Sequence, residues 1–565
     1  MSLFSSISQA NNSLKASQIG LQVVGQNIAN ANTPGYTREE VVLAPAPTQK
    51  VGGLLLGMGV QVRGVVQKID KFLDERLRSA TSDRVGAEVQ EQTYLTLESL
   101  MGELGDTDLS SSLTSFFGSL NDVVNQPEDV LVRGLAVQKG ETLTQDINRL
   151  ANRVRDERAN VNAQVIRLAD DVNRLTEEIR SLNVRIATAE GGDVSISDAV
   201  GLRDQRYVAL QNLAELVDIK VTEQDSGTLT VFVGGQYLVF EGQRREVQVV
   251  STNDRGMTVS EVQLADSQSP LNVTGGELGG LIAARDSVLG EFLDGFDQWT
   301  EALVFELNKV HSSGQGLTGY DSLTSEFGVD DVTTPLDEAG LPFLPASGSF
   351  QVLVQDKQTG ETRTELIQVD LDGIGSDTTL ADLATSLDAI DGVSTEITSA
   401  GKLKLSSESV NSQFSFADDT SGVLASLGIN TFFGGSTALD IRVQDFLRDD
   451  PSKLAVSRGG IGEDSANAVE LTAFADKPLE SQRGVSVLVL YDRLVGEVTQ
   501  GATIARSVAE GFRVFEQTLE GQRLATSGVS LDEEAVKMIT LQRAYQATAR
   551  YIATLAELLD VLVNL

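Results

Sequence analysis

The sequence contains no cysteine, and it contains a single histidine, His311, among its 565 residues. Without cysteine there can be no disulfide, no thiolate nucleophile, and no zinc or iron–sulfur site with cysteine ligands. A Ser-His-Asp triad or a histidine metal site would have to use His311 alone. Most enzyme mechanisms that use a cysteine or several histidines are therefore excluded.

Positive charge is also scarce, because 44 Lys and Arg residues stand against 81 Asp and Glu residues, for a formal net charge of −37. A nucleic-acid-binding protein needs a basic surface that replaces the counterions of the phosphate backbone. An anionic membrane surface attracts basic segments for the same electrostatic reason. The charge balance therefore argues against both kinds of partner.

Long apolar runs are missing too. No stretch approaches the 18 consecutive apolar residues that a membrane-spanning helix needs. The N-terminal residues lack the basic region, apolar core and small-residue cleavage site of a secretory signal. We therefore expect no transmembrane helix and no cleaved signal peptide, so the protein is either cytoplasmic or exported by a route that needs no such peptide.

The clearest positive signal is a heptad pattern at both ends of the chain. Spacings alternate between three and four residues, as on the seam of a left-handed coiled coil. Neither helix can bury its seam alone, so each needs a partner, either a globular core or the other terminus together with neighbouring subunits. The seam residues are Leu3, Ile7, Ala10, Leu14, Ser17, Leu21, Val24 and Ile28, then Met538, Leu541, Tyr545, Thr548, Ile552, Leu555, Leu559 and Leu562.

A third heptad run extends from Leu143 to Ile186, with polar breaks only at Glu157 and Gln164. It predicts a long helix over residues 135–189 that ends at Gly191 and Gly192. Shorter helices are expected over 68–101, 279–311 and 494–525.

Strand patterns lie between these helices. Residues 229–240 form two β-rich runs around Gly234 and Gly235, which indicates a hairpin. Residues 350–354, 365–370 and 402–405 alternate with the period of a strand. From 321 to 440 there are 20 acidic residues against four basic ones, so we expect a separate acidic, β-rich domain there.

The pattern as a whole predicts a mixed α and β, elongated, multidomain protein. Heptad helices from both termini would pair as a coiled coil, a long helical layer would follow, and β-rich outer domains would be inserted between helices. The expected domains are a terminal coiled coil (1–33 with 528–565), a mainly helical domain (34–200, 276–320 and 455–527), a β-rich segment (201–275) and an acidic β-rich domain (321–454).

Candidate chemistry is weak throughout. The glycines at 314, 316 and 319 match a dinucleotide-binding spacing, but they follow an expected helix instead of a strand. The segment from Asp370 to Gly373 lacks the remaining ligands of an EF-hand. His311 ends an expected helix, where capping or packing suits it better than catalysis. The sequence therefore predicts no catalytic, cofactor-binding or metal-binding residue.

One segment after the N-terminal heptads is more specific. Its asparagines and the Pro34-Gly35 pair end a helix and form a tight turn, and Tyr36 starts an extended run to Leu43. The segment closely resembles the N-terminal signature of bacterial flagellar axial proteins, the family of rod, hook and hook-associated proteins. The matching positions are Asn27, Asn30, Asn32, Thr33, Pro34, Gly35, Tyr36 and Arg38.

Further segments narrow the resemblance to the hook-associated members of this family. They are residues 306–314, 421–433, 527–535 and 541–550. The chain departs from the family pattern at Ser530, where asparagine is usual, and at Thr548, where asparagine or a small residue is common.

The resemblance implies a structural role without enzymatic activity or cofactor. Relatives leave the cytoplasm through the flagellar type III apparatus without a cleaved signal, and they form a ring or helical array at the junction between hook and filament, outside the cell. The implied partners are further copies of the chain, the hook protein, the second hook-associated protein, and a cytoplasmic export chaperone at the C-terminal region. The alternatives are another axial component, such as a hook or distal rod protein, and an exported acidic hydrolase.

The terminal seams also suggest how order depends on assembly. Ala10 and Ser17 contribute little apolar burial, and isolated helices of such length are marginal in water. We therefore expect residues 1–30 and 530–565 to be largely mobile in the monomer and to become helical on assembly or under a chaperone.

Overall fold

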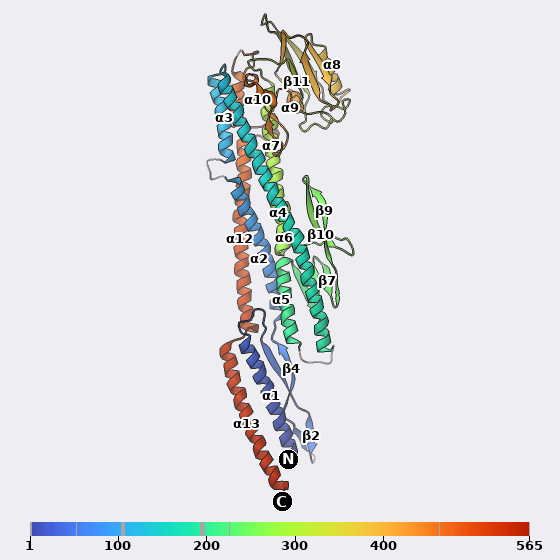
Figure 1. Cartoon of the computed structure of the whole chain (residues 1–565), viewed down its shortest axis with the longest axis vertical. Helices are drawn as coiled ribbons and strands as arrows, with labels where there is room; N and C mark the ends of the chain where they lie inside the picture. The colour runs from blue at the N-terminus through green and yellow to red at the C-terminus, as the bar shows by residue number, and fades with distance from the viewer. Residues whose placement is uncertain are drawn as a thin grey trace. The chain divides into compact units, whose positions relative to one another are not determined.

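The computed structural model describes residues 3–51, 54–102, 108–191, 198–224, 226–462 and 464–563 (Figure 1). Contacts divide the chain into two compact units. The first comprises Met1–Thr93, Ala159–Asp286 and Thr503–Leu565, and the second comprises Tyr94–Arg158 and Ser287–Ala502. These bounds differ from the four domains expected from the sequence, which stay a prediction.

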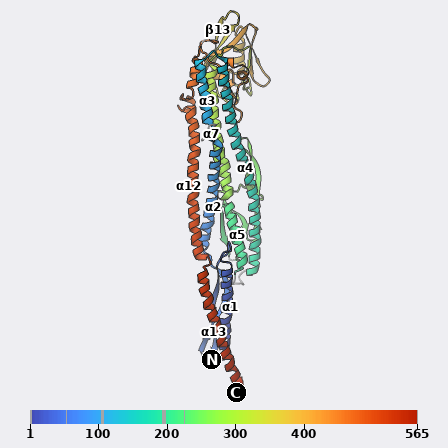
Figure 2. The same cartoon turned by 60° about the vertical axis from the view of Figure 1, so that its left-hand side comes forward.

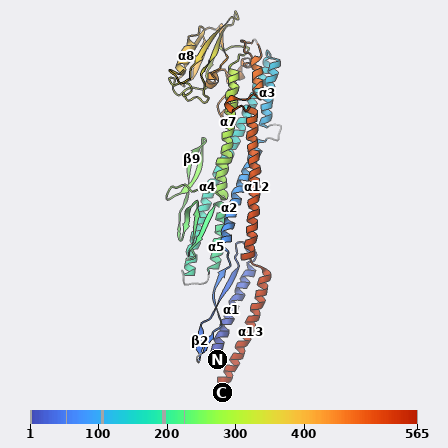
Figure 3. The same ribbon diagram turned by 180° about the vertical axis from the view of Figure 1, so that it is seen from behind.

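The two ends of the chain meet in the first unit. Helix α1 (Leu3–Ala29) and helix α13 (Leu531–Val563) lie side by side and antiparallel in every view (Figure 1, Figure 2 and Figure 3). A long antiparallel hairpin packs on α1. Its strands are β1 (Glu39–Pro45), β2 (Thr48–Val51), β3 (Leu54–Gly57) and β4 (Val60–Gln67). The strand expected from Tyr36 is β1, whereas the returning strands occupy a region expected to be mainly helical.

Long helices follow along the chain, and the heptad prediction for the longest of them, which is shared between the two units, is confirmed. Helix α4 (Val130–Glu190) contains the predicted run, and every apolar residue of that seam from Leu143 to Ile186 is buried. It ends at Glu190 and is followed by Gly191, whose φ of 66° suits glycine. The other predicted stop residue, Gly192, lies outside the described residues. The first unit contains α4 from Ala159 onward, α5 (Val200–Leu216), α6 (Gly276–Ala283), and parts of α2 (Lys71–Met101) and α12 (Val487–Ser527).

Small sheets complete the first unit. One sheet has the strand order β5-β6-β7-β8, with β5 (Ile219–Glu223), β6 (Leu229–Val233), β7 (Gln236–Phe240) and β8 (Gln243–Arg244). The other is the hairpin of β9 (Val247–Asp254) and β10 (Met257–Leu264). The hairpin predicted around Gly234 and Gly235 is confirmed, and φ is positive at both glycines, 54° and 80°.

In the second unit, helices pack through aromatic side chains. Helix α3 (Leu109–Asn125) brings the ring centroid of Phe116 to 5.2 Å from that of Phe432. Helix α7 (Leu289–Ser312) follows the π-helical turn η2 (Ala284–Val288), so the helix predicted over 279–311 is confirmed with one irregular turn. Helix α3 was not predicted, although Leu109, Leu113 and Phe116 have helical spacing.

The acidic region of the second unit is β-rich, as predicted. Its two three-stranded sheets have the orders β11-β15-β14 and β13-β12-β16. The predicted strands lie in β12, β13 and β15, and Phe350, Phe414 and Phe416 fill the core. Its elements are β11 (Ser322–Thr324), β12 (Gly348–Asp356), β13 (Thr362–Val369), α8 (Leu380–Asp388), β14 (Val393–Ile397), β15 (Leu403–Ser407), β16 (Ser412–Ala417), α9 (Val423–Leu427), β17 (Phe433–Gly434), β18 (Arg442–Val443), α10 (Asp445–Asp449) and η3 (Pro451–Lys453). The short elements α11 (Ala466–Ala473) and η4 (Glu480–Gln482) follow it in the second unit.

A search of the helices in the described ranges finds no segment with the length and apolar character of a membrane span.

Candidate functional site: the paired termini and the signature clasp

Helices α1 and α13 pack against each other, and the burial of their side chains can be compared with the predicted seam. In α1, Ala10, Ser17 and Val24 are buried, and Leu3, Ile7, Leu14, Leu21 and Ile28 are partly buried. From residue 531 to 561 every side chain is exposed except Glu534, Met538, Leu541, Thr548, Ile552, Leu555 and Leu559. Tyr545 is 37% exposed at the edge of this face. The side chain of Leu562 lies outside the described residues.

Glycine allows the two helices to approach closely. A Cβ added to Gly20 would lie 3.0 Å from Cδ1 of Leu541, tighter than ordinary van der Waals contact. Gly25 on the same helix has no neighbour of this kind within 4 Å. The side chain of Leu541 therefore packs over the bare backbone at Gly20.

At the end of this helix pair, Asn27 joins three segments of the chain. Its Nδ2 donates to the backbone oxygen of Glu39 at 3.0 Å and to Oε2 of Glu534 at 3.1 Å. Its Oδ1 accepts from the Tyr36 hydroxyl at 2.8 Å and from the backbone N–H of Glu39 at 2.9 Å. Asn27 is 1% exposed, and both ends of its amide are fully used.

Arg38 completes the junction with a buried ion pair. Its Nε and Nη2 donate to Oε1 of Glu534 at 3.0 and 2.7 Å, and Nη2 lies 2.9 Å from Oε2 of Glu533. The backbone N–H of Arg38 donates to the carbonyl of Ser527, and its carbonyl accepts from Lys68. We call Asn27, Tyr36, Arg38, Glu39 and Glu534 the signature clasp.

The remaining signature residues shape the turn before the clasp. Asn30 Nδ2 donates to the carbonyl of Gln26 at 3.0 Å, and its Oδ1 accepts from the Thr33 hydroxyl at 3.2 Å. Gly35 has a φ of 75°, and a Cβ there would lie 2.3 Å from Cγ2 of Val208. Asn32 and Pro34 are exposed, and no side-chain hydrogen bond is found for Asn32 within the described residues.

Helix α5 holds the signature strand from the other side. Oδ1 of Asp204 accepts from the backbone N–H of Thr37 at 3.3 Å and from Nε2 of Gln67 at 2.6 Å. The backbone N–H of Gln67 also donates to Oδ2 of Asp198 at 3.0 Å. These bonds connect α5 to both the signature and β4.

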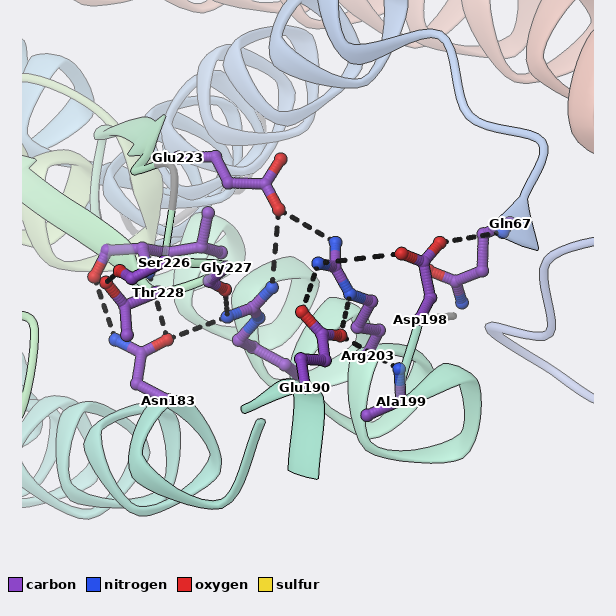
Figure 4. A network of polar contacts seen from close by, with 12 residues as sticks. Gln67, Asn183, Glu190, Asp198, Ala199, Arg203, Glu223, Ser226, Gly227 and Thr228 are labelled. Atoms are coloured by element: carbon purple, nitrogen blue, oxygen red, sulfur yellow. Dashed lines mark hydrogen bonds and ion pairs between the residues drawn. The ribbon is translucent and has the colours of Figure 1, made fainter. Parts of the chain in front are cut away.

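Asp198 belongs to a larger polar network, shown in Figure 4. Arg203 donates through Nε and Nη2 to the two carboxylate oxygens of Glu190, at 2.7 and 2.8 Å, and through Nη1 to Glu223 at 2.8 Å. Glu190 also accepts from the backbone N–H of Ala199. The network fixes the end of α4 to the start of α5 and to strand β5.

Burial and charge shift several pKa values at the clasp. Burial raises the pKa of Glu534, but hydrogen bonds from Asn27 and Arg38 outweigh this effect and hold it below its ordinary value. Burial, with the nearby charge of Glu39 adding to it, raises the pKa of Asp204 to about 6, because hydrogen bonds from Thr37 and Gln67 compensate only in part. Burial also raises the pKa of the Tyr36 hydroxyl.

The lone histidine has a packing role. His311 is 0% exposed, and its Nδ1 lies 2.8 Å from the carbonyl of Asn430, to which it must donate. Its Nε2 accepts from the backbone N–H of Ala455 at 3.2 Å, so the ring is neutral. Burial lowers its pKa to about 4. Packing, one of the two roles predicted, is therefore correct, and the ring carries no charge for a helix cap.

The glycine motif at residues 314–319 and the aspartate segment that starts at Asp370 both lie in loops. A Cβ at Gly316 would lie 2.5 Å from the carbonyl of Ser452, and one at Gly319 would lie 2.8 Å from that of Phe414, so these glycines allow close backbone packing. Asp370, Asp372 and Asp377 each offer a carboxylate oxygen within 4.8 Å of the others. Asp372 and Asp377 accept from backbone N–H groups of the same loop, which accounts for their convergence.

Three protein families match this chain. The flagellar hook-associated protein FlgK helical domain matches residues 94–327, the flagellar basal body rod FlgEFG protein C-terminal family matches 520–565, and the flagella basal body rod protein family matches 9–37. The last two fall on the helices that pair in the structure and on the signature. All three matches are therefore to families of flagellar rod and hook-associated proteins.

Within that class, the full-length similarity is to flagellar hook-associated protein 1. The protein of that name from Escherichia coli (strain K12) is 26% identical over 99% of this chain and 99% of its own length. The one from Bacillus subtilis (strain 168) is 26% identical over 100% of this chain and 98% of its own length. A solved structure of the flagellar hook junction protein FlgK from Burkholderia pseudomallei covers 79% of this chain and 99% of its own, with a TM-score of 0.49 and 14% identity.

Two residues of the site escaped sequence reasoning. Glu534 lies in the C-terminal motif, yet nothing in the sequence pairs it with Asn27 across 507 positions. Asp204 lies in a segment expected to be β-rich, whereas the structure places it on α5. The available signal was an acidic residue one step before the predicted seam, since Glu534 precedes Met538 by four residues and would continue its spacing.

Proposed function

We propose that this chain is a structural axial protein of the bacterial flagellum that forms the junction between hook and filament. It assembles with further copies of itself through α1 and α13. The observation that supports this most directly is the clasp, in which signature residues at the N-terminus bind a buried glutamate near the C-terminus. The family matches fall on the same two ends.

The partners and the route follow from this role. We propose that the array contacts the hook protein on one side and the second hook-associated protein on the other. Before export from the cytoplasm without a cleaved signal, a chaperone would cover the C-terminal region. The apolar side chains that α13 leaves exposed, such as Val536 and Val561, support this, because an exposed apolar face needs a cover.

Deletion of residues 1–30 tests the proposal. We expect the truncated chain to be absent from flagella and the cells to be non-motile, because the seam and Asn27 are lost together. Normal motility with the truncated chain would contradict the assembly role. Immunogold labelling decides the position: label along the rod or hook would favour another axial component over a junction protein.

The proposal includes no catalytic activity. The neutral, buried His311 has both ring nitrogens committed to backbone groups, which supports this view. Activity of the purified chain on peptidoglycan or peptides would favour the exported hydrolase instead.

A further inference from the structure

A groove of about 660 Å³ runs beside the signature in the first unit. Helix α1, the signature turn, β4 and α5 line it. Ile19, Val23, Val65 and Val208 give it apolar walls. The groove adjoins the contact between α1 and α13, because Val23 also lines the cavity between those helices. We call it the signature groove.

Acidic side chains give this groove its charge. Glu39, Asp198 and Asp204 all line it. Within the described part of the chain, no lysine or arginine forms an ion pair with Glu39 or Asp204, whereas Asp198 lies 3.8 Å from Arg203. The groove therefore offers an apolar cleft with carboxylates that lack a cation.

Basic side chains, which would complement these carboxylates, lie on the face of α13 that points away from its seam. Arg543 and Arg550 lie seven residues apart, so they share one helix face, opposite the seam. Val536, Ile539 and Val561 share that face and are 64%, 50% and 59% exposed. Within the residues that the structure describes, neither arginine has a carboxylate partner. From Val536 to Arg550 this face is apolar and basic, in a chain whose net charge is −37, and Asp532 and Glu557 lie on the same face beyond the two ends of that stretch.

We propose that the signature groove binds the outer face of α13 from a second copy of this chain, with Arg543 and Arg550 of that copy pairing with Glu39 and Asp204. In its own chain α13 uses its seam on α1, so its outer face is available to a neighbour. Charge complementarity supports the match, since an arginine fork suits a carboxylate and highly acidic copies otherwise repel each other. The inference rests on the proposed function, because it needs an array of copies.

Charge reversal tests the pairing in a strain that lacks the chromosomal copy of the gene. We expect R543E/R550E and D204K each to lower the amount of chain in isolated flagella at least tenfold. The combination of all three changes should restore part of the loss. The matched control is R167E/R185E, which makes the same charge change on exposed positions of α4. Incorporation of R543E/R550E equal to that of the control would overturn the inference.

Cysteine cross-linking gives an independent readout, since the chain has no cysteine of its own. Gln205 is exposed on the groove rim, and Ala547 is exposed on α13 between the two arginines. Co-expressed Q205C and A547C chains should form a disulfide-linked dimer in oxidised flagella, and S251C with A547C should not. If fully assembled flagella lack the disulfide between Q205C and A547C, the signature groove does not bind α13 of a second copy, and the junction role stays intact. Normal incorporation of the chain without residues 1–30 would instead contradict the junction role.

Discussion

Asn27 and Asn32 belong to the same sequence signature, but the structure separates their roles. Asn27 is buried with both ends of its amide bonded, and Asn32 is exposed. A single sequence does not distinguish them, because the difference depends on Glu534 and Tyr36, which reach Asn27 only in the folded chain. Sequence reasoning could therefore find the signature but could not say which of its side chains hold it together.

The substitution Asn27→Asp tests the clasp with little change in shape. Aspartate keeps the oxygen acceptors but loses both N–H donors, and it places a second carboxylate beside Glu534. We expect local opening of the clasp to become easier by about 3 kcal/mol. Amide exchange at residues 36–39 should then accelerate by about two orders of magnitude, whereas Asn32→Asp should leave it unchanged. Equal effects of the two variants would contradict the structure.

Asp204 makes the stability of the fold depend on pH. Its pKa is raised to about 6 in the folded chain, so between about pH 4 and pH 6 the folded state holds a proton that the unfolded state has lost. Its contribution to stability therefore falls as pH rises through that window and stays low above it. In Asp204→Asn, Oδ1 can keep both hydrogen bonds that this atom accepts.

We expect the Asp204→Asn chain to be about 1–2 kcal/mol more stable than the wild type at pH 7.5 and nearly equal to it at pH 4. Urea unfolding at the two pH values measures this. A constant difference between the two proteins at both pH values would show that Asp204 does not titrate in this range.

At the scale of elements, periodic burial could be predicted and long-range pairing could not. The α4 seam was visible because a heptad run needs only local sequence, and its apolar residues are buried as expected. The hairpin at Gly234 was visible because its turn needs glycine. Helix α5 was missed because charged residues interrupt its apolar face, and Arg206 and Tyr207 are buried by tertiary contacts.

Gly20 allows the close contact between α1 and α13, and Gly25 supplies a matched control on the same helix. Gly20→Val adds methyl groups against Leu541, which should weaken the helix pair by about 1–3 kcal/mol. Gly25→Ala meets open space and should strengthen helix α1 by about 1 kcal/mol. The amount of chain in isolated flagella should fall for the first variant and hold for the second. Equal incorporation of both variants would show that the close contact at Gly20 is dispensable.

Hydrogen exchange compares the terminal helices with α4. Most side chains of α13 are exposed in one chain, whereas the apolar seam of α4 is buried, so α1 and α13 have less burial to oppose their ordering entropy. In the dilute monomer we expect residues 3–29 and 531–563 to exchange much faster than α4. In isolated flagella both should become protected. Protection equal to that of α4 in the monomer would mean that the two helices are stable without assembly.

For the molecule as a whole, the two ends of the sequence carry the proposed assembly surface, and the middle supplies separate folded regions. The signature and the C-terminal motif could be recognised from sequence because their residue types and spacings are distinctive. The role of α5 as support for the signature could not, because Asp204 reaches Thr37 across 167 positions. The acidic β-rich region has its own aromatic core, so its fold does not depend on the paired termini.

Electron cryomicroscopy of isolated flagella tests the central claim most directly. The map should place this chain between hook and filament, with α1 and α13 of each copy paired and the outer face of α13 against a neighbouring copy. Density for the chain in the rod, along the hook or at the filament tip, or a junction in which α1 and α13 make no contacts between copies, would contradict the account.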